Sequence, residues 1–575
     1  MPRLKSLFAY LGAEALFWGP FVLVPMLARA VVGEEVWVKD LAAGVGMSAA
    51  FALIGNLFGR FKSAYRIALF VPLFVGSLVV VGTTLAVHGT VTSDTVTAIA
   101  DTPVPWMREF AAHYYGSADI AIAVLLLLPL LGFRLRPRSS LAPRDVRWLN
   151  LAFLLIAIAP AAVKWWLPKD AWCDSRLNDA ERPYFYPWHR YPPFQPLVSL
   201  AHALEERDTF ATALHPVEAP LAVSRAEPSL RPQVLVLVIG ESLSRHHMSL
   251  YGYTRPTNPR LKARSGEIYL FRDVIAPHAY TSASLEKALT FWTPSNMGMR
   301  RGRSLFEAFR EGGFRMYWIS NQPRRGFWET ATSKLAAGAD KQLWVNPNEG
   351  GVHGYRYRAY DSNVLPALAA ALKDPEREKF IAIHLTGNHL DYQQRYPPEF
   401  DLFRGPVPGR APAASAVVNA YDNAVFYNDT ILNEIIRLVE AHSQRAMVLY
   451  FSDHGEEVFD YRVYRGHSEG EVSRFMADIP FLLWVSGEHR KEHRDSLARF
   501  SGYLDRPFSI GHLAHALADL AGLSFTGFDE RRSPFSEKFT PTPRFVGATP
   551  YEEIQRRSPP TVIRVLAEAP VACRS

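Results

Sequence analysis

The sequence predicts an α/β protein in two parts: an N-terminal domain of five transmembrane helices and a larger domain with a mostly parallel β-sheet. The first observation is a series of five long apolar segments before residue 168. The second is that apolar runs of strand length alternate with helical patterns from Arg231 onward, which is typical of sheets covered by helices on both faces. We therefore expect a membrane domain over 1–167, a linker over 168–230 and an α/β domain over 231–575.

The apolar segments of the first part approach the roughly 20 residues that a helix needs to cross a bilayer. The fourth is the shortest and extends back to Ala118. The segments are Leu7–Ala28, Leu41–Gly59, Ile67–Val87, Ile120–Phe133 and Trp148–Leu167.

Lys and Arg are distributed unequally among the loops, and this predicts the orientation. The N-terminus and the second and fourth loops are basic, whereas the first and third loops hold little more than Lys39 and Arg108. The N-terminus is therefore expected in the cytoplasm and everything after Leu167 outside. Because the basic loops account for the net charge of +7, the charge gives no reason to expect a nucleic-acid partner.

The first segment leaves two alternatives open. Ala28-Arg29-Ala30 resembles a signal-peptide cleavage site, but the apolar stretch is long for a signal peptide and four more segments follow. Glu14 lies inside the segment, where a charge is costly and often functional. It is alternatively a helix-end residue that faces loops or water.

Composition changes sharply after the fifth segment. The stretch Arg182–Phe194 is rich in proline and aromatic residues, which disfavour a regular helix and suit the lipid headgroup region. We expect a linker along the outer membrane surface, with a plain extended tether as the alternative. Only Cys173 and Cys573 are present, so a disulfide framework and a cysteine zinc cluster are excluded.

The second part has five candidate strands with helical patterns between them. Val234–Ile239 is a continuous run rich in β-branched residues, as expected for a strand buried on both faces. The other candidate strands are Arg315–Ser320, Phe380–His384, Met447–Phe451 and Ile479–Trp484. The helical patterns are Ser304–Arg310, Ser362–Leu372, Ala416–Ala441 and Gly511–Ala521.

Carboxylates and imidazoles directly follow three of these strands. Glu241 follows the first, His389 the third, and Asp453 and His454 the fourth. Since ligands bind at the carboxyl ends of parallel strands, we expect these groups to meet at one edge. Oxygen and imidazole ligands without thiolate suit zinc or manganese. Ser242 is a poor nucleophile candidate because the second glycine of a nucleophile elbow is missing.

Four blocks of the sequence together form a specific pattern: Val238-Ile-Gly-Glu-Ser-Leu-Ser-Arg-His-His-Met-Ser-Leu-Tyr-Gly-Tyr253, Arg255-Pro-Thr-Asn-Pro259, Trp318-Ile-Ser-Asn-Gln322 and Ser452-Asp-His-Gly-Glu-Glu457. These blocks resemble the bacterial phosphoethanolamine transferases. The resemblance implies an inner-membrane, multi-pass enzyme with five spans and a periplasmic alkaline-phosphatase/sulfatase-like domain. The forms Ser-Asn-Gln and Asp-His-Gly-Glu-Glu are closer to the branch that acts on lipopolysaccharide core sugar than to the lipid A branch.

The resemblance also implies roles for individual residues. Glu241, Asp453 and His454 correspond to metal ligands, and Thr281 corresponds to the nucleophile that the metal also binds. Ser282 and Ser284 are the alternative nucleophiles. His389 and His467 correspond to the catalytic histidines. One or two Zn²⁺ ions are expected, with Mn²⁺ as an alternative.

The implied reaction moves phosphoethanolamine from phosphatidylethanolamine to a lipopolysaccharide acceptor through a covalent intermediate on Thr281. The acceptor is a core sugar or lipid A. Enzymes of the lipid A branch usually carry several periplasmic disulfides, whereas this chain has no cysteine between Cys173 and Cys573. The main alternative is a glycerol-phosphate transferase that uses phosphatidylglycerol; a hydrolase and an inactive scaffold are weaker alternatives.

Overall fold

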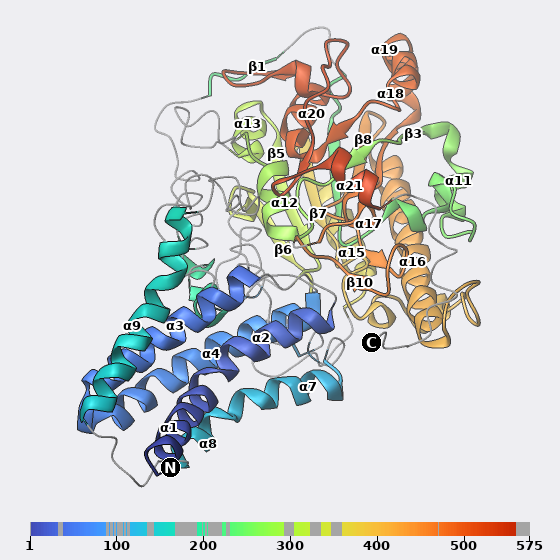
Figure 1. Ribbon diagram of the computed structural model, residues 1–575. Coiled ribbons are helices and arrows are strands. Elements are labelled where there is room, and N and C mark those ends of the chain that lie inside the picture. Colours follow the sequence, from blue (N-terminus) through green and yellow to red (C-terminus); the bar gives the residue numbers. More distant parts are fainter. Residues whose placement is uncertain are drawn as a thin grey trace. The chain divides into compact units, whose positions relative to one another are not determined.

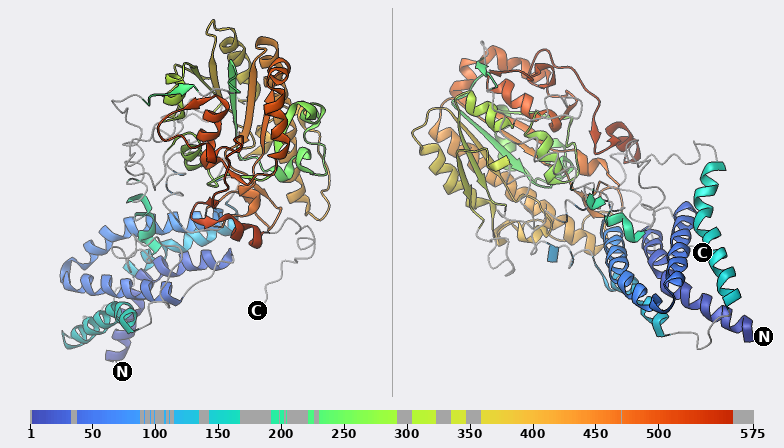
Figure 2. Two further views of the ribbon diagram at one scale, coloured as in Figure 1. Left: turned by 90° about the horizontal axis from the view of Figure 1, so that it is seen from above. Right: turned by 90° about the vertical axis from the view of Figure 1, so that its left-hand side faces the viewer.

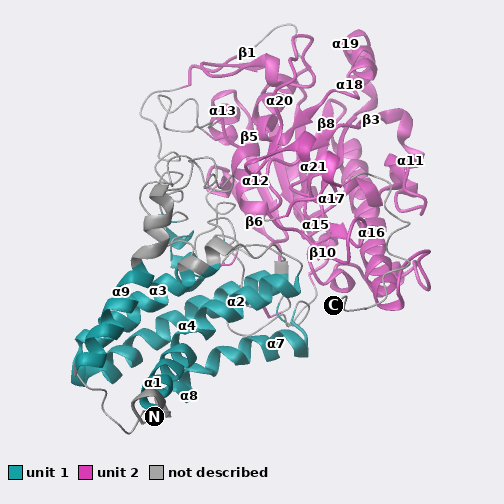
Figure 3. Ribbon diagram, in the orientation of Figure 1, with its two compact units in different colours: residues 1–97, 111–206 teal, residues 98–110, 207–575 magenta. Residues whose placement is uncertain are grey.

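A computed structural model divides the chain into two compact units, each described separately here (Figure 3). Unit 1 comprises residues 1–97 and 111–206, and unit 2 comprises residues 98–110 and 207–575. Apart from isolated residues in 91–111 and 199–204, the structure describes residues 2–32, 38–87, 115–134, 143–166, 192–197, 221–225, 230–291, 304–322, 335–346, 359–469 and 471–558. Most of the expected linker over 168–230 lies outside the described residues.

Unit 1 is helical at each of the five apolar segments (Figure 1). The first segment is broken near Gly19, with a bend of 53° between its two halves, and Pro20 opens the second half. The fourth is divided into three short pieces, the last of which begins at Pro129. The helices are α1 (Pro2–Trp18), α2 (Pro20–Val31), α3 (Val38–Leu57), α4 (Lys62–Val87), α7 (Ser117–Val124), α8 (Pro129–Arg134) and α9 (Pro143–Trp166), with the short turn η2 (Leu125–Leu127) between α7 and α8.

The predicted count of five spanning helices is not confirmed. Within the described residues, one helix, Gly59–Ala86, is long and apolar enough to cross a membrane, and the bent first pair adds at most one more. Gly44–Leu57 and Ser117–Gly132 are apolar but shorter. Breaks near Gly19 and before Pro129 interrupt the apolar stretch in the first and fourth segments.

Glu14 is a buried, ion-paired residue of unit 1 and does not face water. It is 4% exposed. Its carboxylate forms ion pairs with Lys62 and Arg66 of α4, the latter at 2.6 Å, and accepts a hydrogen bond from Trp18 Nε1 at 2.9 Å. The costly charge in the first segment is therefore neutralised by cations from the start of another helix.

Unit 2 is built on a seven-stranded sheet in the order β3-β11-β8-β2-β7-β5-β6. The strands from β8 to β6 are parallel to one another, whereas β11 is antiparallel to both of its neighbours. The strands are β2 (Val234–Gly240), β3 (Ile268–Phe271), β5 (Arg315–Ser320), β6 (Lys341–Trp344), β7 (Lys379–His384), β8 (Ala446–Ser452) and β11 (Phe481–Val485).

Helices cover both faces of this sheet (Figure 2). In β2, Leu235, Leu237 and Ile239 pack into one apolar core together with helices α12, α13 and α20. Alternate residues of the same strand pack into a second core with α15 and α16. The helices of unit 2 are α11 (Pro259–Ala263), α12 (Thr281–Ala288), α13 (Leu305–Glu311), α15 (Val364–Lys373), α16 (Pro412–His442), α17 (Arg474–Ala477), α18 (Gly487–Glu492), α19 (Arg494–Ala498), α20 (Leu513–Leu520) and α21 (Tyr551–Arg557).

The predicted α/β architecture is confirmed, with one correction to the sheet. All five expected strands and all four expected helices are present within a few residues of their predicted ends. However, β11 runs against its neighbours, so the sheet is mixed, and the short edge strands β3 and β6 were not predicted. Apolar periodicity does not specify strand direction, and strands of four residues carry a weak pattern.

Candidate active site

The candidate site lies at the carboxyl ends of β2, β7 and β8. Parallel register places Gly240 beside Ser452, and Ile239 beside His384. The residues that follow these strands therefore leave the sheet side by side. Gly387 lies against this point with φ +53°, and a Cβ there would lie 2.8 Å from the backbone N and O of Glu241.

Three of the predicted metal ligands form a compact, buried group. His454 Nε2 lies 3.3 Å from Glu241 Oε1 and 3.6 Å from Asp453 Oδ2. The candidate ligand atoms of the three side chains all lie within 4.8 Å of one another. None of the three residues is more than 2% exposed.

Hydrogen bonds hold these side chains in place and leave particular atoms open. Asp453 Oδ1 accepts hydrogen bonds from the backbone N–H groups of Ser242 and His454, at 3.1 and 2.7 Å. His454 Nδ1 lies 2.8 Å from the carbonyl oxygen of Gly455, which can only accept, so Nδ1 carries a proton. Among the described residues, Asp453 Oδ2 and His454 Nε2 have no hydrogen-bond partner.

This donor set fits a divalent cation. Two carboxylates and one imidazole, with buried unbonded atoms facing each other, match zinc ligation, and water or substrate can complete the shell. Burial raises the pKa of Asp453 well above its usual range, and the negative charge of Glu241 adds to the effect. Burial opposes the charged form of His454, yet Asp453 and Glu241 raise its pKa to about 10. Without a metal, protons on Asp453 and His454 therefore offset the negative charge of the buried group, as a bound cation would.

Thr281 is the first residue of α12 and joins the same group. Its hydroxyl lies 3.2 and 3.1 Å from Glu241 Oε1 and Oε2 and donates to this carboxylate. The hydroxyl of Ser284, one of the alternative nucleophiles, donates instead to the backbone carbonyl of Asp453 at 2.5 Å and is buried. The geometry therefore favours Thr281 over Ser284 for attack on a substrate.

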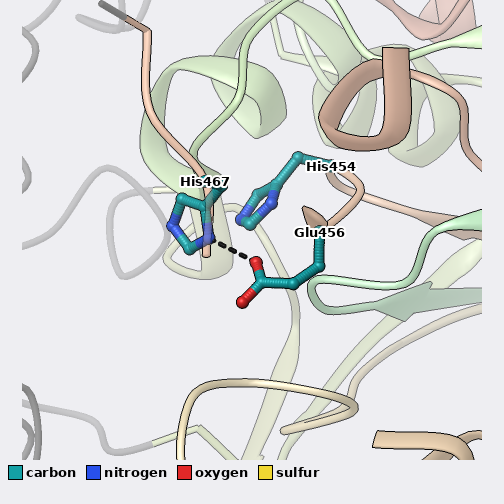
Figure 4. Close-up of side chains that lie close together, drawn as sticks. All are labelled: His454, Glu456 and His467. Carbon is teal, nitrogen blue, oxygen red and sulfur yellow. Dashed lines mark hydrogen bonds and ion pairs between the residues drawn. The ribbon is translucent and has the colours of Figure 1, made fainter. Parts of the chain in front are cut away.

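His467 lies beside the metal-type group and is oriented by a glutamate (Figure 4). The rings of His454 and His467 are 4.1 Å apart between centroids. His467 Nδ1 lies 2.7 Å from Glu456 Oε2, and the other oxygen of Glu456 accepts a hydrogen bond from Tyr392 at 2.6 Å. Since the carboxylate accepts from Nδ1–H, His467 Nε2 is the atom left for a substrate.

His389 also belongs to this neighbourhood. Burial lowers its pKa to about 3, partly offset by the charge of Glu241, and the charges of His454 and His467 also act on it. His384, the last residue of β7, is buried, and burial lowers its pKa to about 4. The structure thus brings all six predicted site residues to one edge of the sheet: Thr281, Glu241, Asp453, His454, His389 and His467.

Sequence reasoning missed two residues that orient Glu241. Gln322 Nε2 donates to Glu241 Oε2 at 3.3 Å and to the Leu385 carbonyl at 3.0 Å. Ser242, with a left-handed φ of +54°, donates its hydroxyl to Glu241 Oε1 at 3.0 Å. Gln322 follows a predicted strand just as the ligands do, so its position was an available signal.

The comparisons with known proteins agree with this site. A family model described as Sulfatase matches residues 233–523. The chain is 34% identical over 465 residues to phosphoethanolamine transferase EptC of Escherichia coli strain K12, and 77% of each chain is covered.

Two solved structures are similar to this chain, one of a periplasmic domain and one of an integral membrane protein. The C-terminal periplasmic domain of EptC from Escherichia coli, in complex with Zn, has 36% sequence identity and a TM-score of 0.53, covering 58% of this chain and 94% of that one. The integral membrane protein lipooligosaccharide phosphoethanolamine transferase A from Neisseria meningitidis has a TM-score of 0.58 and covers 89% of this chain and 97% of its own. At 17% identity, that second likeness shows the fold alone. By its sulfatase-like domain and its identity to EptC, the chain belongs to the phosphoethanolamine transferases.

Proposed function

We propose that this enzyme transfers phosphoethanolamine from phosphatidylethanolamine to a lipopolysaccharide acceptor through a covalent intermediate on Thr281. The observation that carries the proposal is the hydrogen bond from the Thr281 hydroxyl to Glu241 within the buried Glu241–Asp453–His454 group. A hydroxyl in this position is a nucleophile that lies beside a carboxylate and a set of possible metal ligands. Covalent phosphoryl transfer uses this arrangement to activate the hydroxyl.

Zinc is the proposed cofactor, held by Glu241, Asp453 and His454 together with the Thr281 oxygen. The zinc complex of the EptC domain supports this choice. When bound, zinc acts as a Lewis acid that favours the deprotonated hydroxyl and offsets phosphoryl charge. A second group of possible ligands, His454, Glu456 and His467, shares one residue with the first, so one or two ions fit the donor set, and Mn²⁺ is a weaker fit to its imidazoles.

The first half-reaction uses the side chains as follows. Thr281 Oγ attacks the phosphorus of the lipid, a new O–P bond forms, and the bond to the diacylglycerol oxygen breaks. The Thr281 proton lies in its hydrogen bond to Glu241, which accepts it. His467 supplies a proton to the departing diacylglycerol oxygen. His389 is neutral, because burial lowers its pKa to about 3, and donates a hydrogen bond to a phosphoryl oxygen. Because Thr281 begins α12, the unpaired N–H groups of the first helical turn would favour negative charge on a group bound to Thr281.

The second half-reaction reverses these roles. A sugar hydroxyl or phosphate of the acceptor attacks the same phosphorus, and the Thr281–phosphorus bond breaks. A histidine removes the acceptor proton, and Glu241 returns its proton to the departing Thr281 oxygen. His467 suits this exchange because Glu456 fixes Nδ1 as the donor and leaves Nε2 toward the substrate.

The donor lipid explains why a catalytic domain is attached to apolar helices. We propose a multi-pass protein of the bacterial inner membrane, with five spans, an interfacial linker over 168–230 and the domain over 231–575 in the periplasm. The likeness in fold to an integral membrane transferase supports this arrangement. A core-sugar acceptor is favoured over lipid A because the Ser-Asn-Gln and Asp-His-Gly-Glu-Glu forms resemble the core branch.

Intact-mass spectrometry of the detergent-purified protein tests the proposal. After incubation with phosphatidylethanolamine, wild type is expected to gain one phosphoethanolamine, while Thr281→Ala gains nothing and Thr281→Ser, which keeps a hydroxyl, gains the same mass. An adduct with phosphatidylglycerol alone would assign the glycerol-phosphate reaction. Zinc-loaded protein without any adduct would overturn the covalent step.

A further inference from the structure

A second cluster of possible metal ligands lies at the end of α18, away from the site described above. Its members are His489, Glu492 and His493. Because β11 is antiparallel to β8, the chain after Val485 returns to the edge where β8 begins. There the Ser486 N–H donates to the Ala446 carbonyl, and the Ala446 N–H donates to the Ser486 hydroxyl oxygen. His489, Glu492 and His493 then follow at spacings of three and four residues, which places them on one face of a helical turn.

His489 is the anchor of this cluster and is prepared to act as a ligand. The residue is fully buried, and its Nε2 lies 2.8 Å from the carbonyl oxygen of Leu230. The carbonyl can only accept, so Nε2 carries the proton and Nδ1 presents a lone pair. A histidine that ligates a metal usually donates its other N–H in this way. Burial lowers the pKa of His489 to about 4, so the imidazole is neutral.

The lone pair of His489 points into a group of further donors. Its Nδ1 is buried, has no hydrogen-bond partner among the described residues and lies 4.0 Å from Glu492 Oε2. His493 Nε2 is likewise buried and without a hydrogen-bond partner in the described part of the chain, and the two rings lie 4.5 Å apart between centroids. The candidate ligand atoms of the three side chains lie within 4.8 Å of one another, as in the catalytic group.

We propose that His489, Glu492 and His493 form a second site for a zinc-type divalent cation, with water completing the shell. Two imidazoles and one carboxylate are a ligand set that zinc accepts. The site would tie α18 to Leu230, the segment that leads into β2, and so would stabilise the start of the catalytic domain. It is independent of the transfer chemistry at Thr281.

The positive charge of Arg445 competes with a cation for Glu492. Its Nε lies 3.0 Å from Glu492 Oε2, so the carboxylate is paired when no cation is present. A metal at this place has to draw Glu492 away from the guanidinium. Removing the guanidinium charge should therefore strengthen binding, whereas removing any of the three ligands should weaken it.

Zinc binding by the full-length, detergent-purified and chelator-treated protein tests the site. In equilibrium dialysis with metal analysis, wild type should bind one zinc equivalent more than His493→Gln. Glu492→Gln, whose side chain is 48% exposed and is not needed for packing, should bind this equivalent about tenfold more weakly. Arg445→Gln should bind it about fivefold more tightly, since a surface ion pair is lost.

Matched controls separate this site from the catalytic one. Lys491→Gln, on the same helix with a side chain 72% exposed, should bind zinc as wild type does. His493→Gln should still form the phosphoethanolamine adduct, while Asp453→Asn should lose a different zinc equivalent. Equal zinc content in wild type, His493→Gln and Glu492→Gln throughout the titration would overturn the proposal.

Discussion

Thr281 lies 40 residues beyond Glu241 in the chain, yet its hydroxyl donates to that carboxylate. The pairing depends on two local features: a strand end that projects Glu241 and a helix start that projects Thr281. Ser242 and Gln322 restrain the carboxylate from two further directions. The proposed nucleophile and its carboxylate partner are therefore held in place by hydrogen bonds from residues that need not touch a substrate.

Glu456 is expected to act through His467. Glu456→Gln keeps the size of the side chain but loses the charge that holds Nδ1–H, so the transfer rate should fall about 10- to 100-fold, mostly in kcat. Tyr392→Phe removes one of the two hydrogen bonds to Glu456 and should cost less, about 2- to 10-fold. Steady-state kinetics with a fluorescent phosphatidylethanolamine measures both. A Tyr392→Phe effect larger than that of Glu456→Gln would contradict the proposed order.

Zinc affinity at the catalytic group should rise with pH. The pKa of metal-free His454 is raised to about 10, against burial, by Asp453 and Glu241, so the imidazole is protonated at neutral pH. Coordination through Nε2 requires loss of that proton, and each released proton changes affinity by about tenfold per pH unit below the pKa. Calorimetric titration at two pH values, in buffers of different ionisation enthalpy, counts the protons. Binding without proton release would contradict this account.

At the scale of secondary-structure elements, the turn after β7 is expected to affect zinc binding, because Gly387 in this turn lies against the backbone of Glu241. Gly387→Ala should lose zinc affinity as well as stability, because φ is +53° and the new Cβ would press on the backbone of Glu241. The backbone strain alone is worth about 1–3 kcal/mol. Thermal unfolding and zinc titration in detergent measure the two effects.

Gly405 provides the matched control for this change. Its φ is +85°, but a Cβ there would meet no atom within 4 Å. Gly405→Ala should therefore show the strain cost and unchanged zinc affinity. Equal zinc affinities in the two variants would show that the close approach at Glu241 is unimportant.

The helices of unit 1 are joined by charge as well as by apolar packing. Glu14→Gln leaves Lys62 and Arg66 without their buried counter-charge, and breaking a buried pair typically costs about 3–5 kcal/mol. The melting temperature in detergent should therefore fall. The double variant Glu14→Gln/Lys62→Gln restores part of the charge balance and should recover part of the loss. Wild-type stability of Glu14→Gln would refute a stabilising role.

At the scale of the whole molecule, several features could be read from local pattern alone. The run Val234–Ile239 is apolar at every position because β2 is buried on both faces, and it is followed directly by Glu241. Asp453 and His454 follow β8 in the same manner. The carboxyl ends of parallel strands lie at one edge of a sheet. The meeting of these residues could therefore be predicted once β2 and β8 were taken to be parallel.

The sequence by itself therefore determined the α/β class, five of the seven strands of the sheet and the strand-end residues that meet at the candidate site. Only the tertiary structure decided that β11 is antiparallel, that Gln322 and Ser242 orient Glu241, and that His489 donates to Leu230, 259 residues away. The physical reason is the range of the interactions. Apolar periodicity and strand-end position are set by neighbours along the chain, whereas strand direction and cross-chain hydrogen bonds are set by how distant segments pack.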